Sequence, residues 1–264
     1  MIERRGSNRV LLEICVATLE DAKTAELAGA DRLELNSALG LGGLTPSLGL
    51  FLEIKEAVQL PVMAMIRPRP GGFDYGGDDF RVMLRDIKIA VDHGAEGIVC
   101  GVLSESGAID FDRCRTLRVA IGDRRAIFHR AFDLTPDPFD AVESLIELGF
   151  DRVMTSGQEE SAYNGIPLIR QLIDRVGNRI EILPAGGINR FTLNDILART
   201  GCDQVHGSLR EIRVDASASG RPRVRFGAAF SPPEDRFDTT SLHAASDLAA
   251  RLKAFADARE SPSL

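Results

Sequence analysis

The sequence lacks long hydrophobic runs and closely spaced cysteines. No stretch reaches the roughly 20 apolar residues that a membrane-spanning helix needs. The four cysteines, Cys15, Cys100, Cys114 and Cys202, form no C-x-x-C or C-x-C pair, which is typical of free thiols in a reducing compartment. The amino-terminal residues show no apolar segment of signal-peptide type. We therefore expect a cytoplasmic protein with no membrane partner.

The chain also has fewer basic residues than acidic residues. The chain has 32 Lys and Arg against 39 Asp and Glu, which gives a formal net charge of −7. General nucleic-acid binding requires a basic face, so we expect no nucleic-acid partner, although a local basic pocket remains open. The 264 residues, 44% of them hydrophobic and 27% charged, suit one soluble globular domain.

What the sequence does contain is a repeated pair of strand and helix signals. Short apolar runs end in polar or glycine residues, and a helical pattern follows each of the eight: Leu11–Thr18, Asp31–Ala38, Pro61–Pro68, Gly97–Leu103, Arg125–Phe132, Arg152–Gly157, Glu181–Ile188 and Gln204–Leu209. This repeat predicts a closed parallel (β/α)8 barrel, a TIM barrel of the α/β class. We expect a single barrel domain over residues 11–260, preceded by an extension over residues 1–10.

The chain after the eighth strand breaks the repeat. An irregular segment, Arg210–Asp238, precedes a last amphipathic helix over Thr239–Arg259. The segment is rich in arginine, at positions 210, 213, 221, 223 and 225. A solvated face is one interpretation of these arginines, and a flap over an acidic substrate is the other.

The strand ends predict an acid–base cluster. A TIM barrel carries its ligand-facing residues at the carboxyl ends of its strands, and side-chain alternation points the polar face of these strands into the barrel. His129 suits proton transfer, and Arg67 suits binding of an anionic group by paired hydrogen bonds. A closed internal ion-pair network without a catalytic role is the alternative. The candidate catalytic residues are Glu13, Glu34, Arg67, His129 and Asp133.

The later strand ends predict an anion site. TIM barrels often bind phosphate between the loops after strands seven and eight, through backbone N–H groups. Glycine lets a ligand approach the backbone closely, although these glycines could also serve tight turns only. The candidate anion-binding residues are Ser156, Gly157, Gly186, Gly187, Gly207 and Ser208.

A soft metal is the third candidate ligand. Cu(I) prefers thiolate, thioether and imidazole ligands. Cys15, Cys100 and His206 lie at strand ends and are the candidate metal ligands. No spacing guarantees that they converge, and each cysteine could equally be a small buried hydrophobe.

Several blocks in this order resemble the CutC family. They span roughly residues 11–210 and read Glu34-Leu35-Asn36-Ser37-Ala38, Gly42-Gly43-Leu44-Thr45-Pro46-Ser47, Met65-Ile66-Arg67-Pro68-Arg69, Phe128-His129-Arg130-Ala131-Phe132-Asp133, Thr155-Ser156-Gly157, Gly186-Gly187-Ile188 and His206-Gly207-Ser208. The resemblance implies a cytoplasmic TIM barrel named for copper homeostasis, with copper as its cofactor. Together with the frequency of symmetric assemblies, it also implies a homo-oligomer.

Two hypotheses of function follow. One is a copper-homeostasis protein that binds Cu(I) through Cys15, Cys100 and His206. The other is a barrel enzyme that acts on a small anionic metabolite, phosphorylated or carboxylated, through the acid–base cluster.

Overall fold

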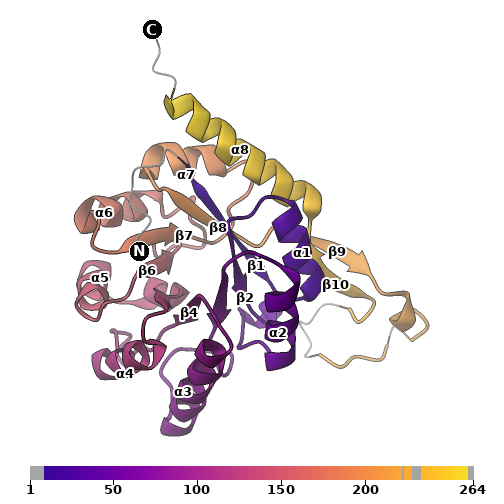
Figure 1. Ribbon diagram of the computed structural model, residues 1–264, viewed down its shortest axis with the longest axis horizontal. Helices are drawn as coiled ribbons and strands as arrows, with labels where there is room; N and C mark the ends of the chain where they lie inside the picture. Colours follow the sequence, from indigo (N-terminus) through magenta and orange to yellow (C-terminus); the bar gives the residue numbers. More distant parts are fainter. Residues whose placement is uncertain (1–8, 222, 228–232, 261–264) are drawn as a thin grey trace.

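The barrel predicted from the repeat is present. The structure, a computed structural model, describes residues 9–221, 223–227 and 233–260, so most of the expected extension lies outside the described residues. Eight parallel strands form one sheet in the order β7-β6-β5-β4-β3-β2-β1-β8, and an Ala185–His206 bridge joins β7 to β8 (Figure 1). The strands are β1 (Leu11–Val16), β2 (Arg32–Leu35), β3 (Val62–Met65), β4 (Gly97–Cys100), β5 (Arg125–Phe128), β6 (Arg152–Thr155), β7 (Glu181–Pro184) and β8 (Gln204–Gly207).

Helices surround this barrel and bury its outer face. Helix starts follow local capping chemistry. Ser47 accepts a hydrogen bond from the N–H of Leu50, and Asp137 accepts from the N–H groups of Phe139 and Asp140, with Pro138 at the first helical position. The helices are α1 (Leu19–Leu27), α2 (Leu48–Ala57), α3 (Gly77–Asp92), α4 (Phe111–Ile121), α5 (Pro138–Glu147), α6 (Ile166–Val176), α7 (Leu193–Thr200) and α8 (Leu242–Glu260). No helix of the described residues is both long and apolar enough to cross a membrane.

The barrel interior is filled in layers of four side chains from alternate strands. Following the strand register around the tilted barrel gives these layers from floor to mouth: Arg32, Gly97, Arg152 and Gln204; then Glu13, Met63, Ile127 and Leu183; then Glu34, Val99, Met154 and His206; then Cys15, Met65, His129 and Ala185. The half formed by β1, β2 and β8 is therefore polar, and the rest of the interior is apolar or glycine except for Arg152 of β6 and His129 at the end of β5.

Two expectations about elements were wrong. Strand β5 ends at Phe128, and a 3-10 helix, η2 (Arg130–Leu134), follows at once. Strand alternation therefore does not extend to Asp133, which was expected to share a strand face with His129. The segment Arg210–Asp238 is not wholly irregular, because strands β9 (Arg210–Val214) and β10 (Arg236–Thr240) pair as an antiparallel hairpin.

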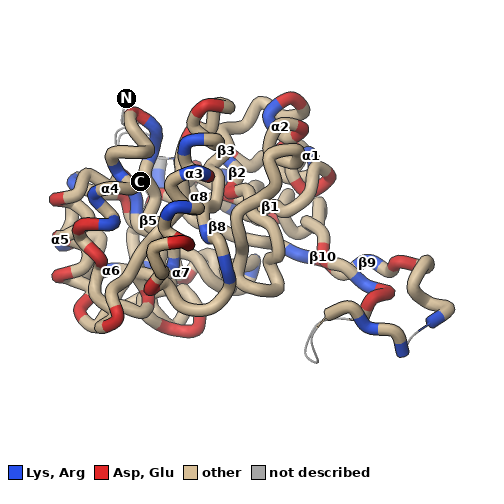
Figure 2. Tube along the Cα trace, turned by 90° about the horizontal axis from the view of Figure 1, so that it is seen from below, with Lys and Arg blue, Asp and Glu red and all other residues tan. Residues whose placement is uncertain are grey.

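This hairpin projects from the body of the barrel and does not cover its mouth (Figure 2). Asp21, fully buried in α1, anchors its base by accepting hydrogen bonds from the N–H and the hydroxyl of Thr240 and Thr239 respectively. Arg210 Nη1 lies 3.0 Å from the same carboxylate. The arginines of this segment thus belong to an arm outside the barrel.

Candidate functional site

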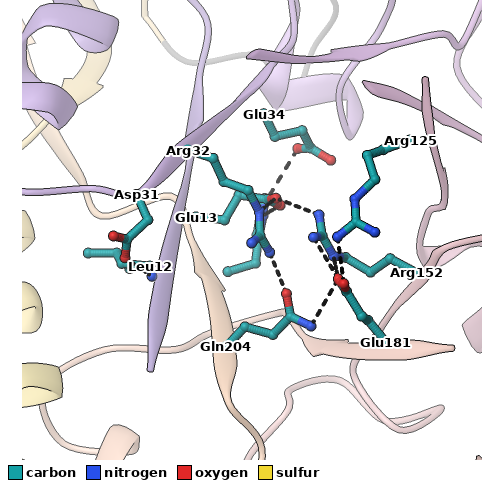
Figure 3. Close-up of polar contacts among 10 residues, drawn as sticks. Leu12, Glu13, Asp31, Arg32, Glu34, Arg125, Arg152, Glu181 and Gln204 are labelled. Carbon is teal, nitrogen blue, oxygen red and sulfur yellow. Dashed lines mark hydrogen bonds and ion pairs between the residues drawn. The ribbon is translucent and has the colours of Figure 1, made fainter. Parts of the chain in front are cut away.

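The floor of the polar half is a closed network of buried charges (Figure 3). Arg32 donates from Nε to Glu13 Oε2 at 2.5 Å and from Nη2 to Gln204 Oε1 at 2.5 Å. Arg152 donates from Nε to Glu181 Oε2 at 2.7 Å, and its Nη1 lies 3.5 Å from Glu13 Oε2. Glu13, from the first strand, is therefore shared by two arginines from opposite sides of the barrel.

These partners decide the charge states of the network. Burial alone would raise the pKa of Glu13, but Arg32, His206 and Arg152 outweigh it and hold that pKa far below its usual range. Burial and the nearby Arg32 lower the pKa of Arg152 to about 10, which leaves it charged at neutral pH. Glu13 is thus a paired structural carboxylate, as the ion-pair alternative describes.

Above this floor, Cys15, Glu34 and His206 converge. One ligand atom of each lies within 4.8 Å of the other two, and all three side chains are buried. His206 Nδ1 lies 2.8 Å from Glu13 Oε1, and its Nε2 lies 3.8 Å from Glu34 Oε2. Asn36 Nδ2 donates to Glu34 Oε2 at 2.7 Å and contacts Cys15 Sγ at 3.3 Å. We call Cys15, Glu34 and His206 the thiol–carboxylate–imidazole cluster.

Burial and neighbouring charges shift the pKa of each member of this cluster. Burial and then Glu34 raise the pKa of the Cys15 thiol well above its usual value. Burial also raises the pKa of Glu34. Burial opposes protonation of His206, but Glu34 and Glu13 overcome it and raise the pKa of this imidazole. At neutral pH the cluster therefore holds protons that a positive ion could displace.

Cys100 does not join this cluster. In β4 the inward residue is Val99, which packs with Met63, Met65 and Ile127 inside the barrel. Cys100 belongs instead to the core between the strands and the helices, where burial and the neighbouring Cys114 raise its pKa. The expected grouping of Cys100 with Cys15 and His206 is thus corrected, because alternation along β4 turns its thiol outward.

Arg67 has a different role from the one expected. Its Nη1 donates to the carbonyls of Leu41 and Gly43 at 3.0 Å, and its Nη2 donates to Gly71 O at 2.7 Å. The guanidinium also lies 5.0 Å from the ring centre of Phe73. These partners tie the loop after β2 to the loop after β3, so the terminal nitrogens expected to bind an anion are already bonded.

His129 is buried at the mouth as a neutral imidazole. Burial and the charge of Arg67 lower its pKa to about 3. Its Nδ1 accepts a hydrogen bond from Ala131 N at 3.3 Å, which leaves the proton on Nε2. That Nε2 is buried without a partner among the described residues. The ring centre of Phe73 lies 4.8 Å from that of His129. Phe73, Leu103 and Leu134 also help to line a surface cavity of about 260 Å³.

Asp133 lies apart, over the end of β6. It accepts hydrogen bonds from Thr155 Oγ1 at 2.5 Å, from Ser156 N at 3.0 Å and from Gln158 N at 3.2 Å. The N–H of Gly157 donates to Thr155 Oγ1 at 2.8 Å. Two of the expected anion-binding amides, those of Ser156 and Gly157, are therefore already occupied within the protein.

The remaining anion candidates lie after β7 and β8. Gly186 and Gly187 have φ values of +102° and +71°, which favour glycine. Gly207 is the buried last residue of β8, and Ser208 is exposed just beyond it. Gly207 is paired with β1 and the Ala185–His206 bridge turns the N–H of Gly186 toward β8, so Gly187 and Ser208 are the candidates that stay available.

Sequence reasoning missed three polar residues that open strands. Arg32, Arg152 and Gln204 are the first residues of β2, β6 and β8, and they point inward at the floor. Each lies two positions before another inward residue of its own strand. These later residues are Glu34, Met154 and His206 respectively. The same alternation, followed backwards from the strand ends, would have found them.

The fold and the cluster together define a TIM barrel with an interior thiol, carboxylate and imidazole. The chain belongs to the CutC family, whose model matches residues 10–211. It is 46% identical over 233 residues to a CutC family protein of Treponema denticola, covering 88% of this chain and 95% of that protein. It is 42% identical over 237 residues to the human copper homeostasis protein cutC homolog, covering 90% and 87%.

A solved structure agrees with this membership. The crystal structure of a CutC protein from Streptococcus agalactiae matches with a TM-score of 0.73 at 33% identity, covering 75% of this chain and 98% of that one. The family expected from the sequence blocks is therefore confirmed.

Proposed function

We propose that this protein serves copper homeostasis by binding copper at the thiol–carboxylate–imidazole cluster. The observation that carries this proposal is the placement of Cys15, Glu34 and His206 with ligand atoms within 4.8 Å of one another. Thiolate and imidazole are the ligands that copper prefers. The Oε1 atom of Glu34 is buried without a hydrogen-bond partner among the described residues, so a ligand position is open.

The surroundings suit such a site. Glu13 binds Nδ1 of His206 at 2.8 Å, which turns Nε2 toward Glu34 and Cys15. A carboxylate behind a ligating histidine fixes the ring and raises its basicity. Copper here would displace the protons of Cys15 and His206, so affinity should rise with pH.

Anaerobic Cu(I) titration against a competing chelator tests the proposal. We expect one copper per chain in the wild type, and a weaker affinity by about tenfold or more in Cys15→Ser and His206→Gln. Cys100→Ser is the matched control, since its thiol is equally buried but faces the outer core. Equal loss in all three variants, or in none, would contradict the site.

A second function is favoured by the mouth of the barrel. Three buried polar atoms there, His129 Nε2, Arg67 Nε and Asn36 Oδ1, have no partner among the described residues. Buried polar groups are normally bonded, so these atoms support a small polar guest. We propose as the alternative an enzyme that acts on a small anionic metabolite, with His129 as proton carrier and Glu34 as a second acid–base group.

Thermal-shift screening of metal-free protein with phosphorylated and carboxylated metabolites tests the alternative. We expect at least one compound to stabilise the wild type and its turnover to disappear in His129→Asn. Stabilisation without turnover would leave a binding protein and contradict the enzyme.

We also propose a cellular location and an oligomeric state for this protein. All four cysteines are buried and free, which supports a cytoplasmic location. The β9–β10 hairpin supports a homo-oligomer, because a projecting two-stranded hairpin is marginally stable alone and this one exposes Ile212 and Val214 by 67% and 71%. A second copy of the chain would cover this face.

A further inference from the structure

One arginine outside the candidate catalytic, anion-binding and metal residues lies beside Gly186 after β7. Arg130 opens η2, directly after His129, and reaches past the end of β6. A Cβ placed on Gly186 would lie 3.4 Å from the guanidinium carbon of Arg130 and 3.4 Å from Ser156 Cβ. The absence of a side chain at Gly186 therefore leaves the guanidinium open to the backbone of the β7 loop.

Two hydrogen bonds hold Arg130 in place and leave its Nη1 without a partner among the described residues. Its Nε donates to Asp133 Oδ2 at 2.8 Å, and its Nη2 donates to Ser156 Oγ at 2.7 Å. Its Nη1 has no partner among the described residues, and the side chain is 43% exposed. The guanidinium thus keeps one donor edge free and held in one orientation, unlike Arg67, whose terminal nitrogens bond loop carbonyls.

The aspartate beside Arg130 does not cancel its charge toward solvent. The Asp133 side chain is only 8% exposed. It also accepts from Thr155 Oγ1 and from the backbone N–H groups of Ser156 and Gln158. These hydrogen bonds stabilise the Asp133 carboxylate on its buried side, so the free edge of the Arg130 guanidinium presents positive charge to solvent.

The β7 loop beside this guanidinium offers a backbone donor. The N–H of Gly187 makes no hydrogen bond among the described residues, whereas the Ala185–His206 bridge turns the N–H of Gly186 toward β8. Because β7 lies between β6 and β8, its loop stands between Ser156 and Ser208. Arg130 and Gly187 are thus both neighbours of Gly186.

We propose that Arg130, with the backbone N–H of Gly187, binds the phosphate group of a small phosphorylated metabolite. A phosphate presents oxygens in several directions and suits donors that converge from two loops. This inference rests on the second function above, a small anionic ligand at the mouth, and it names the group that is recognised. The reacting part of the ligand would then extend toward His129, the residue before Arg130.

Titration of metal-free protein with inorganic phosphate, followed by amide NMR and calorimetry, tests the assignment. We expect saturable binding that shifts the amides of Gly186 and Gly187, and a weaker affinity by about tenfold or more in Arg130→Gln. Arg130→Lys should recover part of it. Arg115→Gln is the matched control, because Arg115 also pairs with an aspartate three residues away on an exposed turn.

Three results would overturn the assignment. They are no saturable phosphate binding, equal weakening by Arg115→Gln, or acetate binding as tightly as phosphate, which would mark a carboxylate site instead. Phosphate binding through Arg130 without turnover of any metabolite would defeat only the enzyme proposal. Unchanged copper affinity in Arg130→Gln is expected in every case, so the copper proposal is tested separately.

Discussion

Glu13 is the residue on which most of the buried charge depends. Its carboxylate contacts Arg32, Arg152 and His206, and it is 1% exposed. Removing one partner of a buried ion pair leaves the other charges uncompensated. We expect Glu13→Gln to lower the free energy of unfolding by about 3 kcal/mol or more, as measured by urea denaturation at pH 7.

The control for this measurement is another paired glutamate. Glu143 bonds Arg175 and Arg179 on the surface. Glu143→Gln should change stability far less, since exposed ion pairs are screened by solvent. Equal losses in the two variants would contradict the structural role assigned to Glu13.

His129 gives stability a pH dependence of known sign. Its pKa is about 3 in the folded protein, below the usual value of 6.5, so the unfolded chain binds more protons between these limits. Its contribution is complete above pH 6.5 and is lost as the pH falls toward 3. We expect the wild type to lose roughly 4 kcal/mol more than His129→Gln over this range. Denaturant titrations at several pH values measure the difference, and parallel curves would contradict it.

At this scale, the sequence could predict which residues point inward but not what they bond. Alternation along β1 and β2 predicted that Cys15 and Glu34 point into the barrel. His206 and Cys100 were grouped with Cys15 only because both lie at strand ends, and in β4 the inward residue is one position before Cys100. The partners of Arg67 are carbonyls in two loops, and no local pattern shows where such carbonyls will lie.

Among the elements, β4 depends on having no side chain at Gly97. A Cβ there would lie 2.4 Å from Met63 Sδ and 3.0 Å from Ile127 Cδ1. Overpacking of this kind typically costs 1–3 kcal/mol, so we expect Gly97→Ala to destabilise the fold by about that amount. Thermal and urea unfolding measure the change.

Gly49 in α2 offers the matched substitution. A Cβ there would meet nothing within 4 Å, and alanine favours helix. Gly49→Ala should therefore leave stability unchanged or raise it slightly. A loss similar to that of Gly97→Ala would show that the barrel interior is not the cause.

Element prediction succeeded where signals are local and failed where they are not. The eight strands and the caps at Ser47 and Asp137 follow from alternation and side-chain chemistry near each helix start. The β9–β10 hairpin escaped prediction because its strands are separated by a long polar connection with arginine, serine and proline. The hairpin is anchored at Asp21, 219 residues before Thr240 in the chain.

For the whole molecule, the hairpin makes assembly testable. Ile212 and Val214 lie on one face of the arm, where Asp238 and Arg236 respectively are their cross-strand partners. If a second copy covers this face, Ile212→Lys combined with Val214→Lys should convert the oligomer to a monomer in light-scattering chromatography. Leu27→Lys, at a residue 76% exposed on α1, is the control and should change nothing. A monomeric wild type would contradict the assembly.

The closed floor of the barrel has a kinetic consequence. Arginines and glutamates seal that end, so a guest that reaches Cys15 leaves only by the way it entered. The loops after β2 and β3, which Arg67 ties together, follow the carboxyl ends of their strands and so stand at the open end of the barrel. Residence time should therefore follow the rate at which those loops separate, and Arg67→Ala should speed release more than it slows capture.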